Sequence, residues 1–195
     1  MARKFNSKVN VEEGKYAVLN GSAYETPADL SGLQTSDYAA VVANAGLYGD
    51  GVKLDETNEI TSATLTDVTA GESEETIATL NGQETQTDGS YAEGTNDSAP
   101  FVGRSYVAKT RQGEEGSSAQ DGFTAYFCPR VRYAPISGST LTSKTDGITY
   151  STTTMAGTCF ADASGKFRYR QEFFGPTAMA DARAWISLRF GVTEG

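Results

Sequence analysis

The stretch Phe123–Ala134, "FTAYFCPRVRYA", decides the fold class, because apolar and polar side chains alternate along it. Successive side chains of a β-strand point to opposite faces, so this pattern predicts a strand with one core face. The predicted core face carries Phe127, Val131 and Tyr133. The opposite face carries Tyr126, Cys128, Arg130 and Arg132. Pro129 has no N–H to donate to a neighbouring strand, which predicts a sheet edge or a bulge at that position.

A second strand precedes this one. The residues "PFVGRSYVAKT", 100–110, favour a strand, and the polar "RQGEEGSSAQDG" that follows, 111–122, is typical of a flexible hairpin tip. The tip does not end in the GK[ST] of a phosphate-binding loop. Two strands joined by a polar connection predict one long β-hairpin.

More strands are indicated on both sides of this hairpin. Upstream they cover residues 15–19, 38–43 and 60–68, and downstream 148–160 and 167–174, the last two joined by the tight turn "ADASGK". Between the second and third of these strands, residues 44–60 are polar, glycine-punctuated and without periodicity. We therefore expect a long exposed loop or hairpin arm there, and such long segments commonly serve function.

Two helices are expected. The first covers about 72–80, with acids in its first turn and Asn81-Gly82 as its stop. The second follows Pro176 and ends near Gly191, with Met179, Ala182 and Ile186 forming an apolar stripe beside Trp185. The sequence thus predicts a mainly β domain with one short flanking helix and a C-terminal helix.

Composition narrows the function classes. The chain has 195 residues, enough for one domain spanning 1–195, and no histidine, which removes Ser-His-Asp and Cys-His catalysis. No carboxylate pair or nucleophile motif stands out, so we expect no catalytic site, cofactor or metal. Cys128 and Cys159 form no CxxC motif and are expected to be reduced and packed in strands. The N-terminus lacks the apolar core of a signal peptide, and no apolar run is long enough for a membrane span, so a soluble protein made in the cytoplasm is expected.

Charge is unevenly distributed along a chain whose net charge is −9. Residues 54–103 hold 11 acids and no Lys or Arg, whereas residues 104–195 hold 11 basic and 8 acidic residues. The acidic segment is either a solvated loop region or a surface that meets a basic partner or repels a polyanion.

A series of segments in a fixed order resembles the major tail (tail tube) proteins of long-tailed bacteriophages. The segments are "APFVGRSYV" (99–107), "AYFCPRVRYAP" (125–135), "SKTDGITYSTTTMAGTCF" (143–160), "SGKFRYRQEFF" (164–174) and "ARAWISLRF" (182–190). The resemblance covers about residues 99–190, and a weaker likeness extends upstream. The hairpin tip is longer than that family's pattern, and Cys128 stands where a larger side chain is expected.

The resemblance implies a β-sandwich or barrel-like tail-tube fold, with six copies closing into a ring and rings stacking into a hollow tube. Such a protein is part of the virion tail and is assembled in the host cytoplasm. Its partners would be other copies of itself, the tape measure protein, the tail terminator and the distal tail or baseplate proteins. DNA would pass through the lumen without specific binding, and an acidic surface suits passage because a basic channel would bind the phosphates.

In such tubes the long loop and an N-terminal arm reach neighbouring subunits, which here would be residues 44–60 and 1–13. The resulting interface candidates are Leu47, Tyr48, Asp50, Lys53, Leu54, Asp55, Glu56 and Glu59 in the loop, and Lys4 and Phe5 in the arm. Four arginines that alternate with aromatic residues are further candidates: Arg130, Arg132, Arg168 and Arg170. If their strands share a sheet, the four would share a face and meet carboxylates of segment 54–103 on an adjacent copy. The alternative is that they are surface arginines whose stems cover apolar neighbours.

Two other functions remain open. One is another ring-forming phage or secretion-system protein, such as the inner tube of a contractile tail or a head-tail joining protein. The other is a secreted β-sandwich that binds carbohydrate, with Tyr24, Tyr48 and Tyr91 as surface stacking residues and "NGS" and "NDS" as glycosylation acceptors.

Overall fold

The computed structural model of the chain describes residues 4–50, 52–114, 118–136 and 151–192. In these ranges the chain forms eleven β-strands and two α-helices, which confirms the mainly β class. The strands are β1 (Lys4–Asn20), β2 (Ala23–Tyr24), β3 (Ala28–Asp29), β4 (Leu33–Gly49), β5 (Val52–Thr69), β6 (Glu84–Thr85), β7 (Tyr91–Ala92), β8 (Val102–Glu114), β9 (Gln120–Tyr133), β10 (Thr153–Phe160) and β11 (Tyr169–Phe174). The helices are α1 (Glu74–Asn81) and α2 (Ala178–Arg189).

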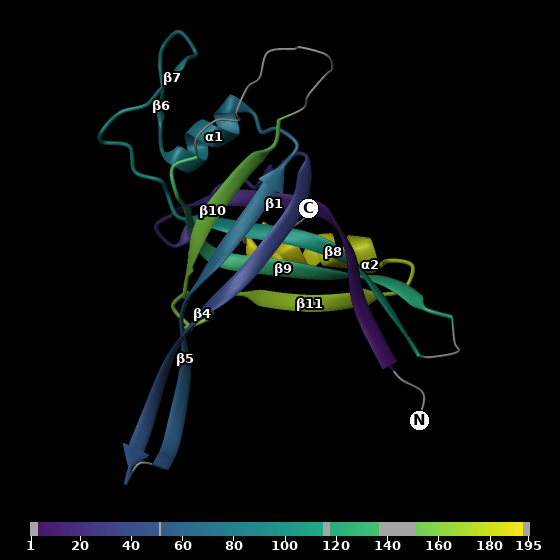
Figure 1. Ribbon diagram of the computed structural model, residues 1–195. Helices are drawn as coiled ribbons and strands as arrows, with labels where there is room; N and C mark the ends of the chain where they lie inside the picture. The colour runs from purple at the N-terminus through teal and green to yellow at the C-terminus, as the bar shows by residue number, and fades with distance from the viewer. Residues whose placement is uncertain (1–3, 51, 115–117, 137–150, 193–195) are drawn as a thin grey trace, which may run out of the picture.

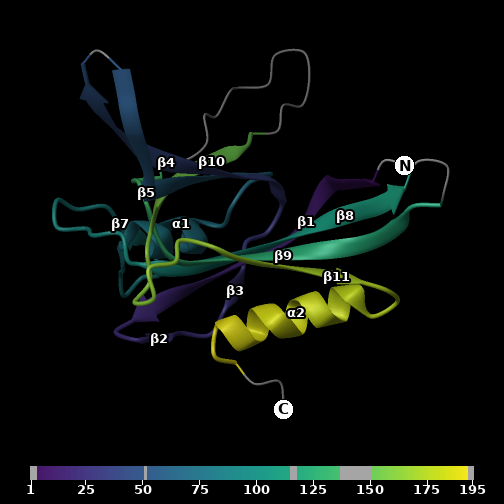
Figure 2. The ribbon, with the colours of Figure 1, turned by 90° about the horizontal axis from the view of Figure 1, so that it is seen from below.

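Nine of these strands form one antiparallel sheet in the order β2-β1-β8-β9-β10-β5-β4, with β11 also paired to β9 and β3 to β1. Strand β9 takes part in two layers, because residues 122–127 pair with β11 and residues 130–133 pair with β10. Figure 1 shows β4, β5 and β10 crossing the layer made by β1, β8, β9 and β11. Helix α2 covers the outer face of that second layer (Figure 2).

A bulge at Pro129 corrects the predicted faces of β9. Val102 pairs with Val131 but Arg104 pairs with Cys128, so β9 contains one extra residue beside β8. The extra residue reverses the alternation. Phe127, predicted to share a face with Val131, instead packs under α2, and Cys128 joins Val131 in the core between the layers. The bulge itself was one of the two structures that the proline predicted.

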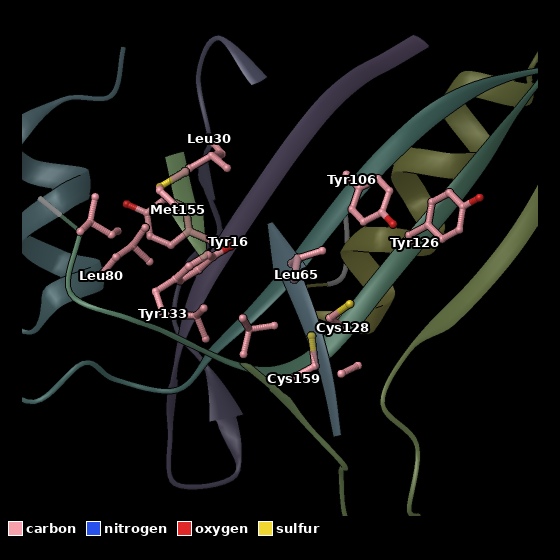
Figure 3. Close-up of a cluster of buried hydrophobic side chains, with 14 of the residues drawn as sticks. Tyr16, Leu30, Leu65, Leu80, Tyr106, Tyr126, Cys128, Tyr133, Met155 and Cys159 are labelled. Atoms are coloured by element: carbon pink, nitrogen blue, oxygen red, sulfur yellow. The ribbon is translucent and has the colours of Figure 1, made fainter. Parts of the chain in front are cut away.

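The main core lies between the two layers (Figure 3). It contains Tyr16, Leu30, Leu65, Leu80, Tyr106, Tyr126, Val131, Tyr133, Met155 and both cysteines. Cys128 and Cys159 are free and buried, as expected. A second cluster joins α2 to the sheet and includes Phe127, Ile186 and Phe190. Trp185, on the predicted apolar stripe of α2, is only partly buried against this second cluster.

The short helix α1 ends at the predicted Asn81-Gly82 stop, and its N-terminus is capped by Ser73, which the sequence pattern did not single out. The Ser73 side chain accepts a hydrogen bond from the Thr76 N–H at 3.1 Å, which caps the N-terminus. Gly82 ends the helix with φ of 73°, a left-handed conformation that favours glycine. The Asn81 side chain bonds both backbone groups of Ile136, so α1 is fastened to the end of β9.

A buried ion pair corrects the assignment of the whole acidic segment to the surface. The Asp67 carboxylate accepts hydrogen bonds from Nε and Nη2 of Arg104, both at 3.0 Å, and from the Tyr133 hydroxyl at 2.6 Å. All three residues are buried. Asp67 is therefore part of the core, because Arg104 and Tyr133 satisfy its oxygens there.

Three predicted boundaries also differ. Residues 4–13, expected as an arm, are part of β1 and pair with β8, so the first strand is much longer than 15–19. Most of the predicted hairpin tip is strand, with Arg111 paired to Asp121 and Gln112 to Gln120. The strands predicted at 38–43 and 60–68 extend through 44–49 and 52–59, which pair with each other as the hairpin arm, one of the two predicted alternatives. The start of the strand predicted at 148–160, and the "KTDGI" motif at 144–148, lie outside the described residues.

Candidate subunit interface

The distal parts of β4 and β5 form an arm that projects away from the rest of the molecule in both views (Figures 1 and 2). Here "arm" means residues 44–50 and 52–60. Pairing runs along it from Asn44 opposite Asn58 to Gly49 opposite Val52, with one register shift between Leu47 and Tyr48. This is the hairpin arm that the sequence offered as one of two possibilities. It carries eight of the residues predicted for the interface.

The arm exposes apolar side chains. Leu47, Tyr48 and Leu54 are 61%, 66% and 64% exposed, and Val52 and Ile60 are also exposed. None of these five belongs to either apolar cluster of the described residues. A two-stranded hairpin without a packed face is marginally stable in water. Contiguous exposed apolar residues mark surfaces that contact another molecule.

The arm is also acidic. It contains Asp50, Asp55, Glu56 and Glu59 against one lysine, Lys53. Lys53 is paired within the arm, with its Nζ 2.5 Å from Oε2 of Glu56. Across the described residues Asp50, Asp55 and Glu59 have no ion-pair partner. The arm therefore presents an apolar surface with uncompensated negative charge.

Both edges of the arm are open in the described part of the chain. Strand β10 pairs with β5 only at residues 63–69, which leaves 52–62 with a single neighbour, β4. The outer edge of β4 pairs with no other strand in these ranges. Unpaired strand edges present N–H and C=O groups to a strand of another chain.

Arg130 and Arg132 lie together on one aromatic ring at the far end of β9. Their Cζ atoms lie 4.4 and 4.1 Å from the centre of the Phe101 ring. Phe101 in turn contacts Phe160 edge to face at 5.3 Å. Two like charges on one ring with no ion-pair partner in the described ranges form a surface suited to a carboxylate.

Arg168 and Arg170 belong to a different surface. The Arg168 Cζ lies 3.8 Å from the centre of the Tyr38 ring and 5.3 Å from that of Tyr126. Arg170 is exposed on β11, opposite Tyr126. The expectation that all four arginines would share one face is therefore wrong, because the bulge divides β9 between two neighbours. The Cζ atoms of Arg130, Arg132 and Arg168 all lie over aromatic rings, an arrangement compatible with both predicted roles, covering apolar neighbours and contacting a second copy.

Lys4 and Phe5 are distant from the arm. They lie at the start of β1, at the opposite side of the molecule in Figures 1 and 2. The Lys4 ammonium lies 3.2 Å from Oε1 of Glu114, and the Phe5 ring covers Gly113, where an added Cβ would lie 2.8 Å from Cζ of Phe5. Both candidates thus contact their own chain and remain exposed.

The tyrosines of the carbohydrate alternative do not form one platform. Tyr24 is partly buried between Phe127 and Phe190, and its hydroxyl donates to the Pro129 carbonyl at 2.8 Å. Burial, together with the charge of Asp162, raises its pKa to about 12. Tyr48 is on the arm, and Tyr91 is on β7. The prediction of Tyr24 as a surface residue is wrong.

The described residues contain neither a cluster suited to a metal ion nor a helix suited to a membrane. No group of three or more His, Cys, Asp or Glu side chains there is placed to hold a metal ion. Neither α1 nor α2 has the length and apolar character that crossing a membrane requires.

No protein-family model matches this chain, and no curated protein matches it either.

Proposed function

We propose that this chain is a structural virion protein that assembles head to tail into stacked, six-membered rings, forming the hollow tail tube of a long-tailed phage. The observation that carries the proposal is the arm, whose apolar side chains and strand edges are left uncovered by the described part of its own chain. A second copy would cover them. Among ring-forming assemblies we choose a tail tube because the order of the segments in residues 99–190 resembles that of the tail tube proteins.

Head-to-tail assembly needs two different surfaces that fit each other on every copy. The arm supplies an apolar, acidic surface. The arginine surfaces on Phe101 and beside Tyr38 supply positive charge on aromatic rings, without ion-pair partners in the described ranges. Both kinds of surface on one chain favour a heterologous contact, which closes into a ring when the rotation between copies allows it.

The proposed tube passes DNA without binding it specifically. The chain carries a net charge of −9, and each DNA phosphate is negative, so the overall field opposes non-specific binding to the duplex. The tape measure, terminator and distal tail or baseplate proteins would contact the tube inside and at its two ends. Assembly would take place in the host cytoplasm.

Negative-stain microscopy of the purified chain over a range of concentrations tests the proposal. Tubes or six-fold rings are expected. A chain that remains monomeric at every concentration and salt condition, and binds polysaccharide, would favour the carbohydrate-binding alternative.

A paired substitution tests the charge argument separately. Reversing Arg130 and Arg132 to Glu is expected to prevent tube formation while leaving the monomer folded, because two repelling charges would meet the carboxylates of a neighbour. Normal tubes from this variant would exclude the Phe101 surface from the contact.

A further inference from the structure

A groove at the base of the arm is lined by cations and apolar groups. It has a volume of about 630 Å³ and lies between the β4–β5 hairpin and the connection from β10 to β11. Its walls are Tyr38, Ala40, Ile60, Gly165, Lys166, Phe167, Arg168 and Arg170. Three of these residues are basic and none is acidic.

The turn that supports the cations is held by one carboxylate. Oδ1 of Asp162 accepts hydrogen bonds from the N–H groups of Ser164 and Lys166 at 2.8 and 3.0 Å, and Oδ2 accepts one from the Tyr169 hydroxyl at 2.5 Å. Burial acts to raise the pKa of Asp162, but these hydrogen bonds outweigh it and lower the pKa to about 2. Gly165 allows the turn, with φ of 76°. The backbone position of Lys166 is thus fixed by the fold.

The nearby carboxylate of Asp162 is hydrogen-bonded to the backbone of the turn and to Tyr169, and it forms no ion pair with the cations of the groove. Lys166, Arg168 and Arg170 form no ion pair in the described residues. Arg168 is held between the rings of Tyr38 and Tyr126, which orders its guanidinium group before any partner binds. An ordered cation loses less side-chain entropy on binding.

The arm matches this groove both in charge and in apolar character. Its distal part carries two acids without ion-pair partners in the described residues, Asp50 and Asp55. Its exposed leucines match the apolar walls formed by Phe167 and by Ile60 at the base of the arm. At about 3.3 Å per residue, residues 52–60 extend roughly 25–30 Å, so the distal arm reaches another copy. The cavity between β1 and β4 matches less well, because Lys8 and Arg168 there are balanced by Glu12 and Asp37.

We propose that the groove formed by Lys166, Phe167, Arg168 and Arg170 receives the distal β4–β5 arm of a second copy of this chain. The inference rests on the proposed self-assembly and adds the surface that accepts the arm. The groove adjoins the base of the arm of its own copy, so each copy both inserts an arm and receives one. The contact is therefore heterologous and repeats from copy to copy.

Three full-length variants test the pairing. K166E/R170E reverses the groove, and D55K/E56K reverses the distal arm. R189E is the control, since Arg189 is an exposed arginine of α2 that also forms no ion pair in the described residues. Circular dichroism checks that each variant is folded. Sedimentation velocity then measures the concentration at which each variant associates.

We expect each double variant alone to require a concentration at least about tenfold higher than wild type, since like charges would face each other. R189E should associate within about threefold of wild type. An equimolar mixture of the two double variants should associate like wild type, because each reversed groove then meets a reversed arm.

The outcomes distinguish a failure of the groove assignment from a failure of the proposed function. If K166E/R170E associates no less readily than R189E, or if the mixture of double variants stays dissociated, the groove assignment is overturned. Loss of assembly in R130E/R132E alongside normal assembly of K166E/R170E would overturn the groove while leaving the proposed function intact. A wild-type chain that never associates overturns both.

Discussion

The two ends of strand β5 have the same partner strand and opposite environments. At its base, residues 63–69 lie between β4 and β10, and Leu65 is 0% exposed. Along the arm, residues 52–60 pair with β4 alone, and Leu54 is 64% exposed. Pairing therefore continues well beyond the region where the chain supplies a core. The difference indicates that the base stabilises the subunit and that the arm is completed by another molecule.

The largest expected effect comes from the buried base. Replacing Arg104 with Met would leave the Asp67 carboxylate buried without its cation, and breaking such a pair typically costs about 3–5 kcal/mol of the free energy of unfolding. Urea denaturation of the two proteins measures the change. The double variant R104M/D67L should recover much of the loss, because no unpaired charge remains. A loss below about 1 kcal/mol for R104M would show that the pair is not buried as described.

Leu65→Ala tests the packing of the same region. Removing a fully buried leucine side chain is expected to lower the free energy of unfolding by about 2–4 kcal/mol, from lost burial and the cavity left behind. Denaturant titration under matched conditions gives the value. A change within 0.5 kcal/mol, typical of surface substitutions, would contradict the described core.

A smaller, pH-dependent effect is expected at Glu72, which precedes α1. Burial raises the pKa of its carboxyl from 4.5 to about 7, and its Oε1 has no hydrogen-bond partner in the described residues. Between these two values the folded state holds more protons than the unfolded state, so this group lowers stability as pH rises through the window.

Glu72→Gln removes that titration. We expect the variant and wild type to differ least near pH 4.5, and the variant to be the more stable above about pH 7. Denaturation midpoints at the two pH values provide the measurement. An equal difference at both would show that the Glu72 carboxyl has an ordinary pKa.

The smallest effect on the monomer is expected for Leu54→Ala, the arm counterpart of Leu65→Ala. Because Leu54 is exposed, its removal should change the free energy of unfolding by less than about 0.5 kcal/mol. The same substitution should weaken self-association, since the leucine would be buried only against a second copy. An unfolding loss as large as that of Leu65→Ala would mean that the arm is covered within its own chain.

Local sequence patterns predicted where the strands and helices lie better than they predicted which side chains are buried and which way they face. Alternation and turn residues located the long hairpin, both helices and the bulge at Pro129, because these depend on neighbouring residues. The face assignments on either side of Pro129 failed, since the bulge reverses the alternation that follows it. The burial of Asp67 could not be predicted from its acidic segment, because Arg104 and Tyr133 reach it from distant strands.

At the candidate interface, too, local features were predictable from the sequence and contacts between distant segments were not. The sequence located the exposed acidic segment 44–60, and the open edges of the arm became visible only once β10 was placed beside residues 63–69. The groove escaped sequence analysis because Ile60 and Lys166 come together only in the folded chain. The nearest sequence signal is the run of cations in "GKFRYR", residues 165–170, where the alternation with aromatic residues marks Arg168 and Arg170 as interface candidates but not Lys166.

Amide hydrogen exchange over a range of protein concentrations tests the central claim most directly, by comparing residues 52–60 with residues 63–69. We expect the base to be protected at every concentration, and the arm to exchange rapidly in dilute protein and become protected as copies associate. Arm amides that are already protected in the dilute monomer, or that never gain protection at any concentration, would contradict the account.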